Sequence, residues 1–243
     1  MPQKTALITG GSRGIGAATA RLLGAKGWAV AVNYRADKAA ADATVQAVEA
    51  AGGKAVALQA DMAEPQEIEA MFQASDAAFG RLDALVNNAG IVGPRGPMAD
   101  LTVADIDRVL DVNVRGYMLA AQHAAPRLQA AGGGAIVNVS SGSANIGGAG
   151  EQIIYAVSKG AVNSLGIGLS QELGPLGIRV NTVSPGMTRT DMPPQDKMDR
   201  VAKITPLGRV GEAEEVAAGI VWLLSEEASF VAGANLRISG GRP

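Results

Sequence analysis

Seven apolar segments of strand length recur along this chain, and stretches with helical spacing separate them. Most of these segments are apolar at nearly every position, which is typical of strands buried on both faces of a sheet. Between them, sets such as Ile15, Ala18 and Leu22 place their side chains on one stripe of a helix. Alternating strands and helices predict an α/β fold, a parallel sheet with helices on both faces. The expected strands are Lys4–Thr9, Trp28–Asn33, Lys54–Gln59, Leu82–Asn87, Ala135–Ser140, Arg179–Val183 and Asn235–Ser239.

The chain has the size and composition of one domain. Its 243 residues are 47% apolar, enough to build one sizeable core. No proline-rich linker, charge block or internal repeat divides it. Residues 1–243 are therefore interpreted as a single domain. Residues 187–206 contain Pro193-Pro194 and show no clear periodicity, and we expect this segment to be a substrate lid.

Charge and composition exclude several classes of function. The 23 acidic residues slightly outnumber the 21 basic ones, so no surplus of positive charge is present for nucleic acid or a membrane surface. The absence of cysteine excludes disulfides, thiolate metal sites and a cysteine nucleophile. His123 is the only histidine, and no metal site is expected. The short apolar run at the start predicts neither a signal peptide nor a membrane span, which favours a cytoplasmic location.

A glycine-rich turn follows the first expected strand directly. It runs Thr9-Gly10-Gly11-Ser12-Arg13-Gly14-Ile15-Gly16 and leads into an alanine-rich helix. Glycines let the backbone turn tightly and approach a pyrophosphate, and the amide groups at a helix start favour its negative charge. No Gly-Lys-Ser/Thr sequence follows, so the turn does not support a nucleoside-triphosphate site. It predicts a dinucleotide site, with a tight structural corner as the alternative.

The end of the second expected strand bears on the choice of dinucleotide. A ribose 2'-hydroxyl is usually bound there by a carboxylate, but the residues are Asn33, Tyr34 and Arg35. Arg35 and Arg13 would instead offer two guanidinium groups to a 2'-phosphate. The pattern favours NADP over NAD. The alternatives are that both arginines are solvated surface, or that Asp37 serves the ribose.

A tyrosine and a lysine lie one helical turn apart in Tyr155-Ala156-Val157-Ser158-Lys159. The helical pattern continues to about Leu173, so both side chains share one face, about 6 Å apart along the axis. A neighbouring ammonium is expected to lower the pKa of the phenol and make it a proton donor and acceptor for a carbonyl/alcohol pair. Ser141 closes the fifth expected strand, at the edge where open parallel sheets bind ligands. Gly160, Ser164 and Gly168 leave a shallow face on the same helix, which fits either a subunit interface or packing within the chain.

Together these residues resemble the short-chain dehydrogenase/reductase family along essentially the whole chain. The elements that carry the resemblance are Thr9 to Gly16, Asp61, Asn87 to Gly90, Asn113, Ser141, Tyr155, Lys159 and Pro185-Gly186. The resemblance implies a single dinucleotide-binding and catalytic domain with a doubly wound Rossmann sheet of seven parallel strands in the order 3-2-1-4-5-6-7. It also implies hydride transfer at nicotinamide C4 and a homotetramer.

The resemblance assigns roles to individual residues. Tyr155 would exchange a proton with the substrate oxygen, Ser141 would hydrogen-bond that oxygen, Lys159 would tune Tyr155 and bind the nicotinamide ribose, and Asn113 would hold a water for proton relay. Ser140 and Ser143 are alternative candidates for the role given to Ser141. Ser141 is chosen because the family's catalytic serine is the second of a pair such as Ser140-Ser141. The residues expected to bind the cofactor are Gly10, Ser12, Arg13, Gly14, Ile15, Gly16, Arg35, Asp61, Met62, Asn88, Ala89, Gly90, Tyr155, Lys159, Pro185, Gly186, Thr188 and Thr190.

Several functions remain open at this stage. The leading one is an NADP(H)-dependent reductase or dehydrogenase for a small carbonyl or alcohol. A 3-oxoacyl carrier-protein reductase and a glucose-type sugar 1-dehydrogenase are alternatives within the family. The carrier protein ranks lower because Ala125–Gly134 and Ser170–Gly177, interpreted as flanking the crevice, carry only Arg127 as a basic residue. A dinucleotide sensor without turnover and a methyltransferase are the candidates from other classes, and neither needs the Tyr155/Lys159 pair.

Overall fold

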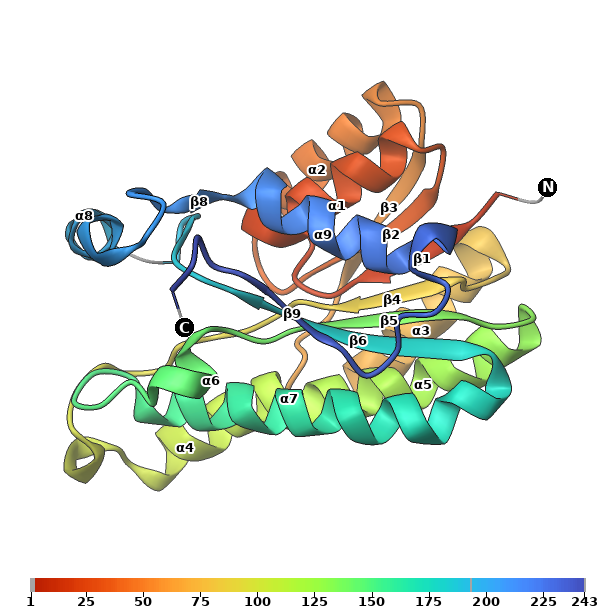
Figure 1. Ribbon diagram of the computed structural model, residues 1–243. Coiled ribbons are helices and arrows are strands. Elements are labelled where there is room, and N and C mark those ends of the chain that lie inside the picture. The colour runs from red at the N-terminus through yellow and green to blue at the C-terminus, as the bar shows by residue number, and fades with distance from the viewer. Residues whose placement is uncertain (1–2, 193, 243) are drawn as a thin grey trace.

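A seven-stranded parallel sheet forms the centre of the computed structural model, which describes residues 3–192 and 194–242 (Figure 1). The strand order is β3-β2-β1-β4-β5-β6-β9, which confirms the predicted order with β9 as the seventh strand. Every pair of neighbours is parallel. The strands of this sheet are β1 Thr5–Ile8, β2 Ala29–Tyr34, β3 Lys54–Gln59, β4 Ala84–Asn87, β5 Gly134–Val139, β6 Ile178–Pro185 and β9 Asn235–Ile238.

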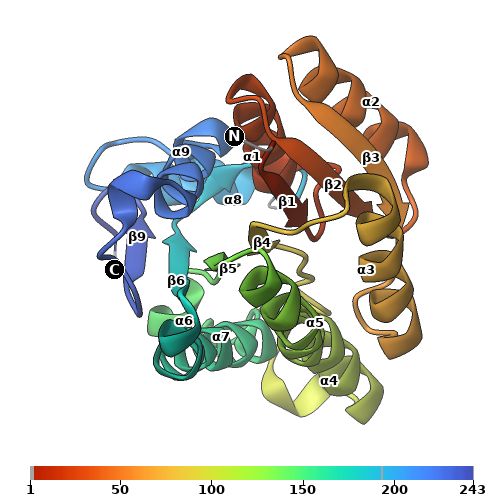
Figure 2. The ribbon, with the colours of Figure 1, turned by 90° about the vertical axis from the view of Figure 1, so that its right-hand side faces the viewer.

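Helices cover both faces of the sheet (Figure 2). On one face lie α1 Gly14–Ala25, α2 Lys38–Ala50 and α9 Ala213–Leu224. On the other lie α3 Pro65–Phe79, α5 Gly116–Ala130 and α7 Ile153–Leu173, with α4 Val103–Leu110 ahead of α5. The predicted helix through Tyr155 and Lys159 is therefore α7, and it ends at the expected Leu173. The remaining short elements are α6 Ser143–Ile146, α8 Gln195–Ile204, the two-residue strands β7 Thr188–Arg189 and β8 Gly211–Glu212, a π-helical turn at Asp111–Arg115, and 3₁₀ turns at Met98–Asp100, Gly174–Leu176 and Glu226–Ala228.

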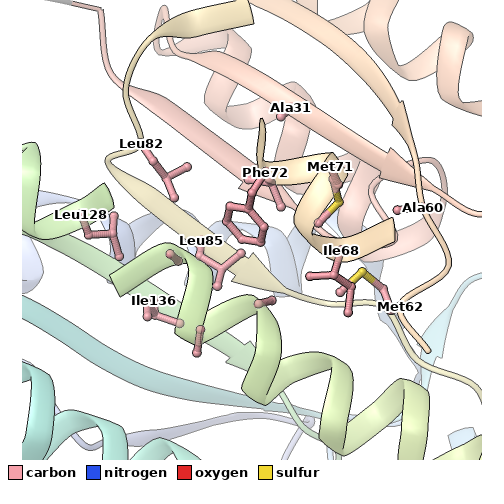
Figure 3. Packing of buried hydrophobic residues seen from close by; sticks show 14 of the residues in the cluster. Ala31, Ala60, Met62, Ile68, Met71, Phe72, Leu82, Leu85, Leu128 and Ile136 are labelled. Carbon is pink, nitrogen blue, oxygen red and sulfur yellow. The ribbon is translucent and has the colours of Figure 1, made fainter. Parts of the chain in front are cut away.

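Each face of the sheet builds its own apolar core. Figure 3 shows Ile68 and Phe72 of α3 with Leu85 of β4 and Ile136 of β5 in one of them. In the other, side chains of α1, α2 and α9 pack on the opposite face of the same strands. The four residues of β1 and of β4 are buried throughout, which is why those segments are apolar at nearly every position.

The sheet brings the loops of interest to one edge, because all its strands run in the same direction. The glycine-rich turn follows β1, and the loops after β4, β5 and β6 emerge at the same carboxyl edge. β1 pairs with β2 on one side and β4 on the other, so the topological switch point lies beside the glycine-rich turn. Helix α8 and strands β7 and β8 stand beyond this edge (Figure 1). The expected lid, residues 187–206, contains β7 and the helix α8, while its residue 193 lies outside the described residues.

Candidate active site

One cavity of about 1290 Å³ opens at the carboxyl edge of the sheet. It is large enough for a dinucleotide together with a small substrate. All the residues predicted from sequence to bind cofactor or to act in catalysis line it, except Gly16 and Asn113. The structure thus brings together side chains and backbone that are up to 180 positions apart, from Gly10 to Thr190.

The glycine-rich turn forms one end of the cavity. Gly10 and Gly14 have φ of +60° and +51°, and a Cβ at Gly10 would lie 2.9 Å from Cα of Ala89. A Cβ at Gly16 would overlap the Gly10 carbonyl oxygen. No side chain caps the start of α1, and its first turn has no acidic residue. The amide groups at the start of α1 are therefore available to an anion, which is the environment that a pyrophosphate needs.

The loop after β4 is tied to this turn by hydrogen bonds. The Thr9 hydroxyl accepts from the amide groups of Asn88 and Ala89, at 2.9 and 3.0 Å. The Asn88 carboxamide donates to the carbonyl oxygens of Thr9 and Gly10, at 3.0 and 2.9 Å. Asn88 thereby fixes the shape of the turn, while its backbone, Ala89 and Gly90 face the cavity.

The end of β2 presents an arginine to the cavity, and a carboxylate follows it two residues later. Strand β2 ends at Tyr34, and Arg35 is exposed and lines the cavity. The Asn33 carboxamide oxygen accepts from the Gly10 amide at 2.9 Å, so Asn33 supports the turn. Asp37 caps α2 by accepting from the Ala40 amide at 3.0 Å. One oxygen of this carboxylate is thus engaged in a helix cap, while Asp37 is exposed and lines the same cavity, so both an arginine and a carboxylate are available at this end.

Asp61, after β3, is held by an arginine that the sequence analysis did not single out. Arg108 of α4 donates to its carboxylate at 2.7 Å, and the Ala63 amide donates at 2.9 Å. Burial raises the pKa of Asp61, but these two hydrogen bonds and the positive charge of Arg108 and Arg35 bring it below the ordinary value. Asp61 is therefore a fixed anion in the wall of the cavity, next to Met62.

The structure separates the three serines that compete for one role. The Ser140 hydroxyl is buried and donates to the Lys159 carbonyl at 2.9 Å. The Ser143 hydroxyl accepts from the Gln152 carboxamide at 2.9 Å. The Ser141 hydroxyl accepts from the Ser143 amide at 3.1 Å, and Ser141 is the serine of the three that lowers the pKa of Tyr155. Ser141 is thus the serine of the three that acts on the phenol, and its catalytic role stays a prediction.

Tyr155 and Lys159 lie on the cavity side of α7, and the Lys159 ammonium is 5.8 Å from the centre of the Tyr155 ring. Burial raises the pKa of Tyr155, and the hydrogen bond from Ser141 offsets part of that rise. Burial lowers the pKa of Lys159 to about 7. The expectation that Lys159 pulls the pKa of Tyr155 below its ordinary value is wrong for this structure, because desolvation dominates at both groups.

A second buried phenol, Tyr117 of α5, explains where the Lys159 side chain points. The Lys159 ammonium donates to the Val139 carbonyl at 2.7 Å and to the Tyr117 hydroxyl at 3.1 Å, and that hydroxyl donates to the same carbonyl at 3.1 Å. Tyr117 was missed from sequence. The sequence does contain one indication of its role: Tyr117 follows Asn113 by four residues, and that spacing places both side chains on one side of a helix.

The burial of Lys159 predicts a pH-dependent stability. Its pKa is about 7 in the folded chain and 10.5 ordinarily, so between these values the unfolded chain holds a proton that the folded chain lacks. The free energy of unfolding should then rise with pH by up to about 1.4 kcal/mol per pH unit from this group. Urea unfolding of wild type and Lys159→Met at about pH 7 and about pH 9 measures it. A wild-type minus variant difference that does not grow with pH would contradict the burial of this amine.

Asn113 lies in the π-helical turn Asp111–Arg115, where the Gly116 amide donates to the carbonyl five residues earlier. Its carboxamide nitrogen donates to the Ile91 carbonyl at 2.9 Å and the Ser158 hydroxyl at 3.0 Å, and its oxygen accepts from the Ile91 amide at 2.9 Å. Asn113 thus joins α7 to the loop after β4. A Cβ at Gly90 would lie 3.4 Å from Lys159 Nζ and 3.5 Å from Asn113 Oδ1, so this loop passes directly beside both side chains.

The segment after β6 closes the other side of the cavity. The Gly186 amide donates to the Ile238 carbonyl at 2.9 Å, and a Cβ there would lie 2.7 Å from Cα of Ser239. The Thr188 hydroxyl donates to the Gly186 carbonyl at 3.1 Å. The Thr190 side chain lies beside Gly14, within 3.0 Å of a Cβ built there. The start of the expected lid therefore meets the glycine-rich turn.

One sequence argument is corrected by the fold. Ala125–Gly134 and Ser170–Gly177 do not flank the cavity of this chain, because they lie at the amino edge of the sheet, where β5 and β6 begin. Arg127 also donates to both carboxylate oxygens of Asp76, at 3.0 Å to Oδ1 and 2.7 Å to Oδ2. The scarcity of basic residues in these stretches therefore gives no information about the charge around the cavity mouth.

Two searches of the described residues complete the description of the site. Residues 3–192 and 194–242 contain no group of three or more His, Asp or Glu side chains arranged to hold a metal ion. None of the helices in these ranges combines the length and the apolar character needed to cross a bilayer.

Comparison with known proteins gives matches along nearly the whole chain. The family model described as "Enoyl-(Acyl carrier protein) reductase" matches residues 10–242. "Uncharacterized oxidoreductase YgfF" of Escherichia coli (strain K12) is 47% identical, covering 98% of this chain and 99% of that protein. "Cis-4-hydroxycyclohexanecarboxylate dehydrogenase" of Sinomonas cyclohexanicum is 39% identical, covering 98% and 96%. A short-chain dehydrogenase from Burkholderia cenocepacia J2315, solved in complex with NADP, is 42% identical with a TM-score of 0.92 and covers 99% of this chain and 98% of that one.

Proposed function

Because the chain belongs to the short-chain dehydrogenase/reductase family and is an oxidoreductase, we propose that it transfers hydride between NADP(H) and a small carbonyl or secondary-alcohol substrate. The observation that carries the proposal is the position of Tyr155, Lys159 and Ser141 in the same cavity as the glycine-rich turn. The Sinomonas relative, named for a hydroxylated cyclohexanecarboxylate, supports a small secondary alcohol as the substrate class.

The residues at the glycine-rich turn fit a dinucleotide. A Cβ at Gly10 or Gly16 would fill the space beside the turn, and the start of α1 offers uncapped amide groups. In our proposal the turn holds the pyrophosphate, Asp61 and Met62 contact the adenine, and Asn88 to Gly90 lie beside the ribose. Pro185, Gly186, Thr188 and Thr190 receive the nicotinamide end. When bound, the nicotinamide donates or accepts the hydride.

The chain's own residues handle the proton and the substrate oxygen. For reduction, Tyr155 donates a proton to the carbonyl oxygen while the Ser141 hydroxyl hydrogen-bonds the same oxygen and steadies its developing charge. Burial keeps Tyr155 protonated at neutral pH, which is the form that reduction needs. Lys159 lies next to Tyr155 and can return a proton to it, since its pKa of about 7 lets it exchange protons near neutrality. Asn113 positions α7 against the loop after β4, and we propose that its turn supports the water relay.

Arg35→Asp should reverse the cofactor preference. The substitution removes a guanidinium from the place expected for the 2'-phosphate and supplies an acceptor for a 2'-hydroxyl. NADP affinity should fall about tenfold to about a hundredfold relative to NAD affinity. Fluorescence titration of both cofactors measures the ratio. Lys26→Asp, at the far end of α1, makes the same change in net charge and is the control, so it should not change the ratio of NADP to NAD affinity. If Arg35→Asp also left that ratio unchanged, Arg35 would not belong to the cofactor site.

We also propose that residues 187–206 act as the lid of a single catalytic domain. Arg13 of the glycine-rich turn and Asp191 lie 3.8 Å apart, and Lys197 of α8 contacts the loop ahead of α7. The segment therefore spans from the cofactor end of the cavity to its substrate end. A cytoplasmic location remains a prediction from the sequence.

We further propose that the chain forms a homo-oligomer, a tetramer by analogy with its family, through one face of α7. Nothing lies within 4 Å of a Cβ built at Gly160 or Gly168, and Val157 and Ile167 on the same helix are 57% and 54% exposed. Small residues with exposed apolar neighbours allow close approach of a second helix. Equilibrium sedimentation at micromolar concentration should give a multiple of 24.6 kDa, and a monomeric mass would contradict the interface.

The experiment that tests the function is a turnover assay. Purified protein is offered a panel of ketones, aldehydes and sugars with NADPH, and the corresponding alcohols with NADP⁺, and nicotinamide absorbance is followed. Turnover with part of the panel is expected. Tight NADPH binding with no turnover of any class would instead favour a dinucleotide sensor, and binding of S-adenosylmethionine in place of NADPH would favour a methyltransferase.

A further inference from the structure

Glu151 is the point where three segments of the substrate end of the cavity meet. It lies in the loop ahead of α7, and its carbonyl accepts from the Gly96 amide of the loop after β4, at 3.2 Å. Its carboxylate accepts from the Lys197 ammonium of α8 at 2.5 Å, and the same ammonium lies 3.3 Å from the Gln152 carboxamide oxygen. The Glu151–Lys197 pair therefore fixes one side chain of the lid at the substrate end.

Positive charge exceeds negative charge around this pair. Lys197 contributes most to the lowered pKa of Glu151, and Arg200 and Arg95 lower it further, so three cations act on one carboxylate. All four residues line the cavity. Arg200 lies 3.7 Å from Asp196 at an exposed position, whereas Arg95 has no ion pair within residues 3–192 and 194–242. Glu151 and Asp196 together balance two of the three cations, which leaves a surplus of one positive charge around this pair.

The cations share their cavity with apolar side chains and with the reacting group. The Lys197 side chain is only 14% exposed, so its charge acts in a partly dehydrated place. Apolar residues of the lid line the same end of the cavity, namely Met187, Val201 and Ile204. Tyr155 and Ser141 lie in that cavity too. A ligand that fits these walls has an apolar body, an oxygen that Tyr155 can reach and an anionic group.

We infer that the substrate of this enzyme carries a carboxylate, which Arg95 and Lys197 bind. The inference rests on the proposed function for the reacting oxygen, and it adds the second recognition point. Arginine and lysine donate charge-assisted hydrogen bonds to carboxylates, and a cleft lined by one sign of charge concentrates ligands of the other. Glu151 occupies Lys197 in the structure described here, and the substrate carboxylate competes with Glu151 for that ammonium.

Binding of unreactive acids tests the inference without depending on turnover. Isothermal titration calorimetry compares hexanoate with hexanamide, and cyclohexanecarboxylate with cyclohexanecarboxamide, on the protein with NADP⁺. At least one acid should bind about tenfold or more tightly than its amide. Equal affinities within both pairs, including no binding of any of the four, would overturn the inference.

Three variants then locate the anion. Arg95→Met should weaken acid binding about tenfold and leave amide binding unchanged. Glu151→Gln should strengthen acid binding several-fold, because it removes the competing carboxylate; a merely structural ion pair would instead weaken acid and amide alike. Lys203→Met, also on α8 and exposed, is the matched control and should change neither.

The two proposals fail in different ways. Turnover of neutral ketones with no preference for acids would leave the oxidoreductase function intact and reject the carboxylate site. If acids bound in a way that depends on Arg95 but no substrate in the panel turned over, the proposed oxidoreductase reaction would be rejected and the carboxylate site would stand. A third outcome is that small acids do not bind, while an acidic acyl carrier protein forms a complex that Arg95→Met abolishes. That outcome would reject a small carboxylate substrate and indicate that Arg95 binds a docked protein.

Discussion

Replacing Tyr155 by Phe should lower kcat/KM for carbonyl reduction by about a thousandfold. The substitution removes only the hydroxyl that we propose as the proton donor, and it keeps the buried ring. NADPH affinity and thermal stability should stay close to wild type, since none of the contacts that shape the glycine-rich turn involves this hydroxyl. Steady-state kinetics with the best substrate of the panel, beside NADPH titration, measures both quantities.

Ser141→Ala is the matched control for this variant. Its loss should be smaller, about tenfold to about a hundredfold, because Ser141 stabilises the developing charge but does not supply the proton. A Tyr155→Phe enzyme that turns over at near wild-type rate would show that another group is the acid. A variant that no longer binds NADPH would show that Tyr155 acts in cofactor binding and not in proton transfer.

Lys159→Met should lower kcat by about a hundredfold or more and also weaken NADPH binding, a combination that Tyr155→Phe should not show. The ammonium is hydrogen-bonded beside Tyr155 and faces the same cavity, so its loss affects both the phenol and the ribose site proposed here. Because Lys159 is 2% exposed, replacing it by an apolar side chain of similar length removes the cost of burying a charge, and the fold should persist.

The pH dependence of alcohol oxidation sharpens this prediction. In the proposed mechanism the neutral Lys159 amine, whose pKa is about 7, accepts the proton of Tyr155 during oxidation, so without Lys159 the rise of the oxidation rate near neutral pH should be lost. Lys54→Met, at the exposed start of β3 on the opposite edge of the sheet, is the control and should behave as wild type. An unchanged kcat and pH profile in Lys159→Met would contradict the role given to the amine.

The sheet and the cavity could be predicted because the signals that specify them are local. Buried parallel strands read as continuous apolar runs, so all seven were found, and the structure moves their ends by no more than two residues. The glycine-rich turn and Ser141 were placed at one edge by the rule that parallel strands share their carboxyl ends. Tyr155 and Lys159 needed only helical spacing.

What could not be predicted depends on contacts between distant segments. Arg108 reaches Asp61 across 47 positions and Lys197 reaches Glu151 across 46, and neither arginine nor lysine stands in a motif. The pKa of Tyr155 was misjudged because spacing along a helix fixes the distance to Lys159 but not the burial of both groups, and burial dominates. The α8 helix within the lid was missed because its sequence is mostly polar and buries only Met198 and Val201.

Transfer of deuterium from NADPH labelled at nicotinamide C4 tests the central claim most directly. The alcohol formed from an active ketone is analysed by mass spectrometry, with wild type and Tyr155→Phe side by side. The account predicts one deuterium on the carbinol carbon, formed rapidly by wild type and far more slowly by the variant. Bound NADPH with no deuterium in any product, or equal rates of transfer in the two proteins, would contradict it.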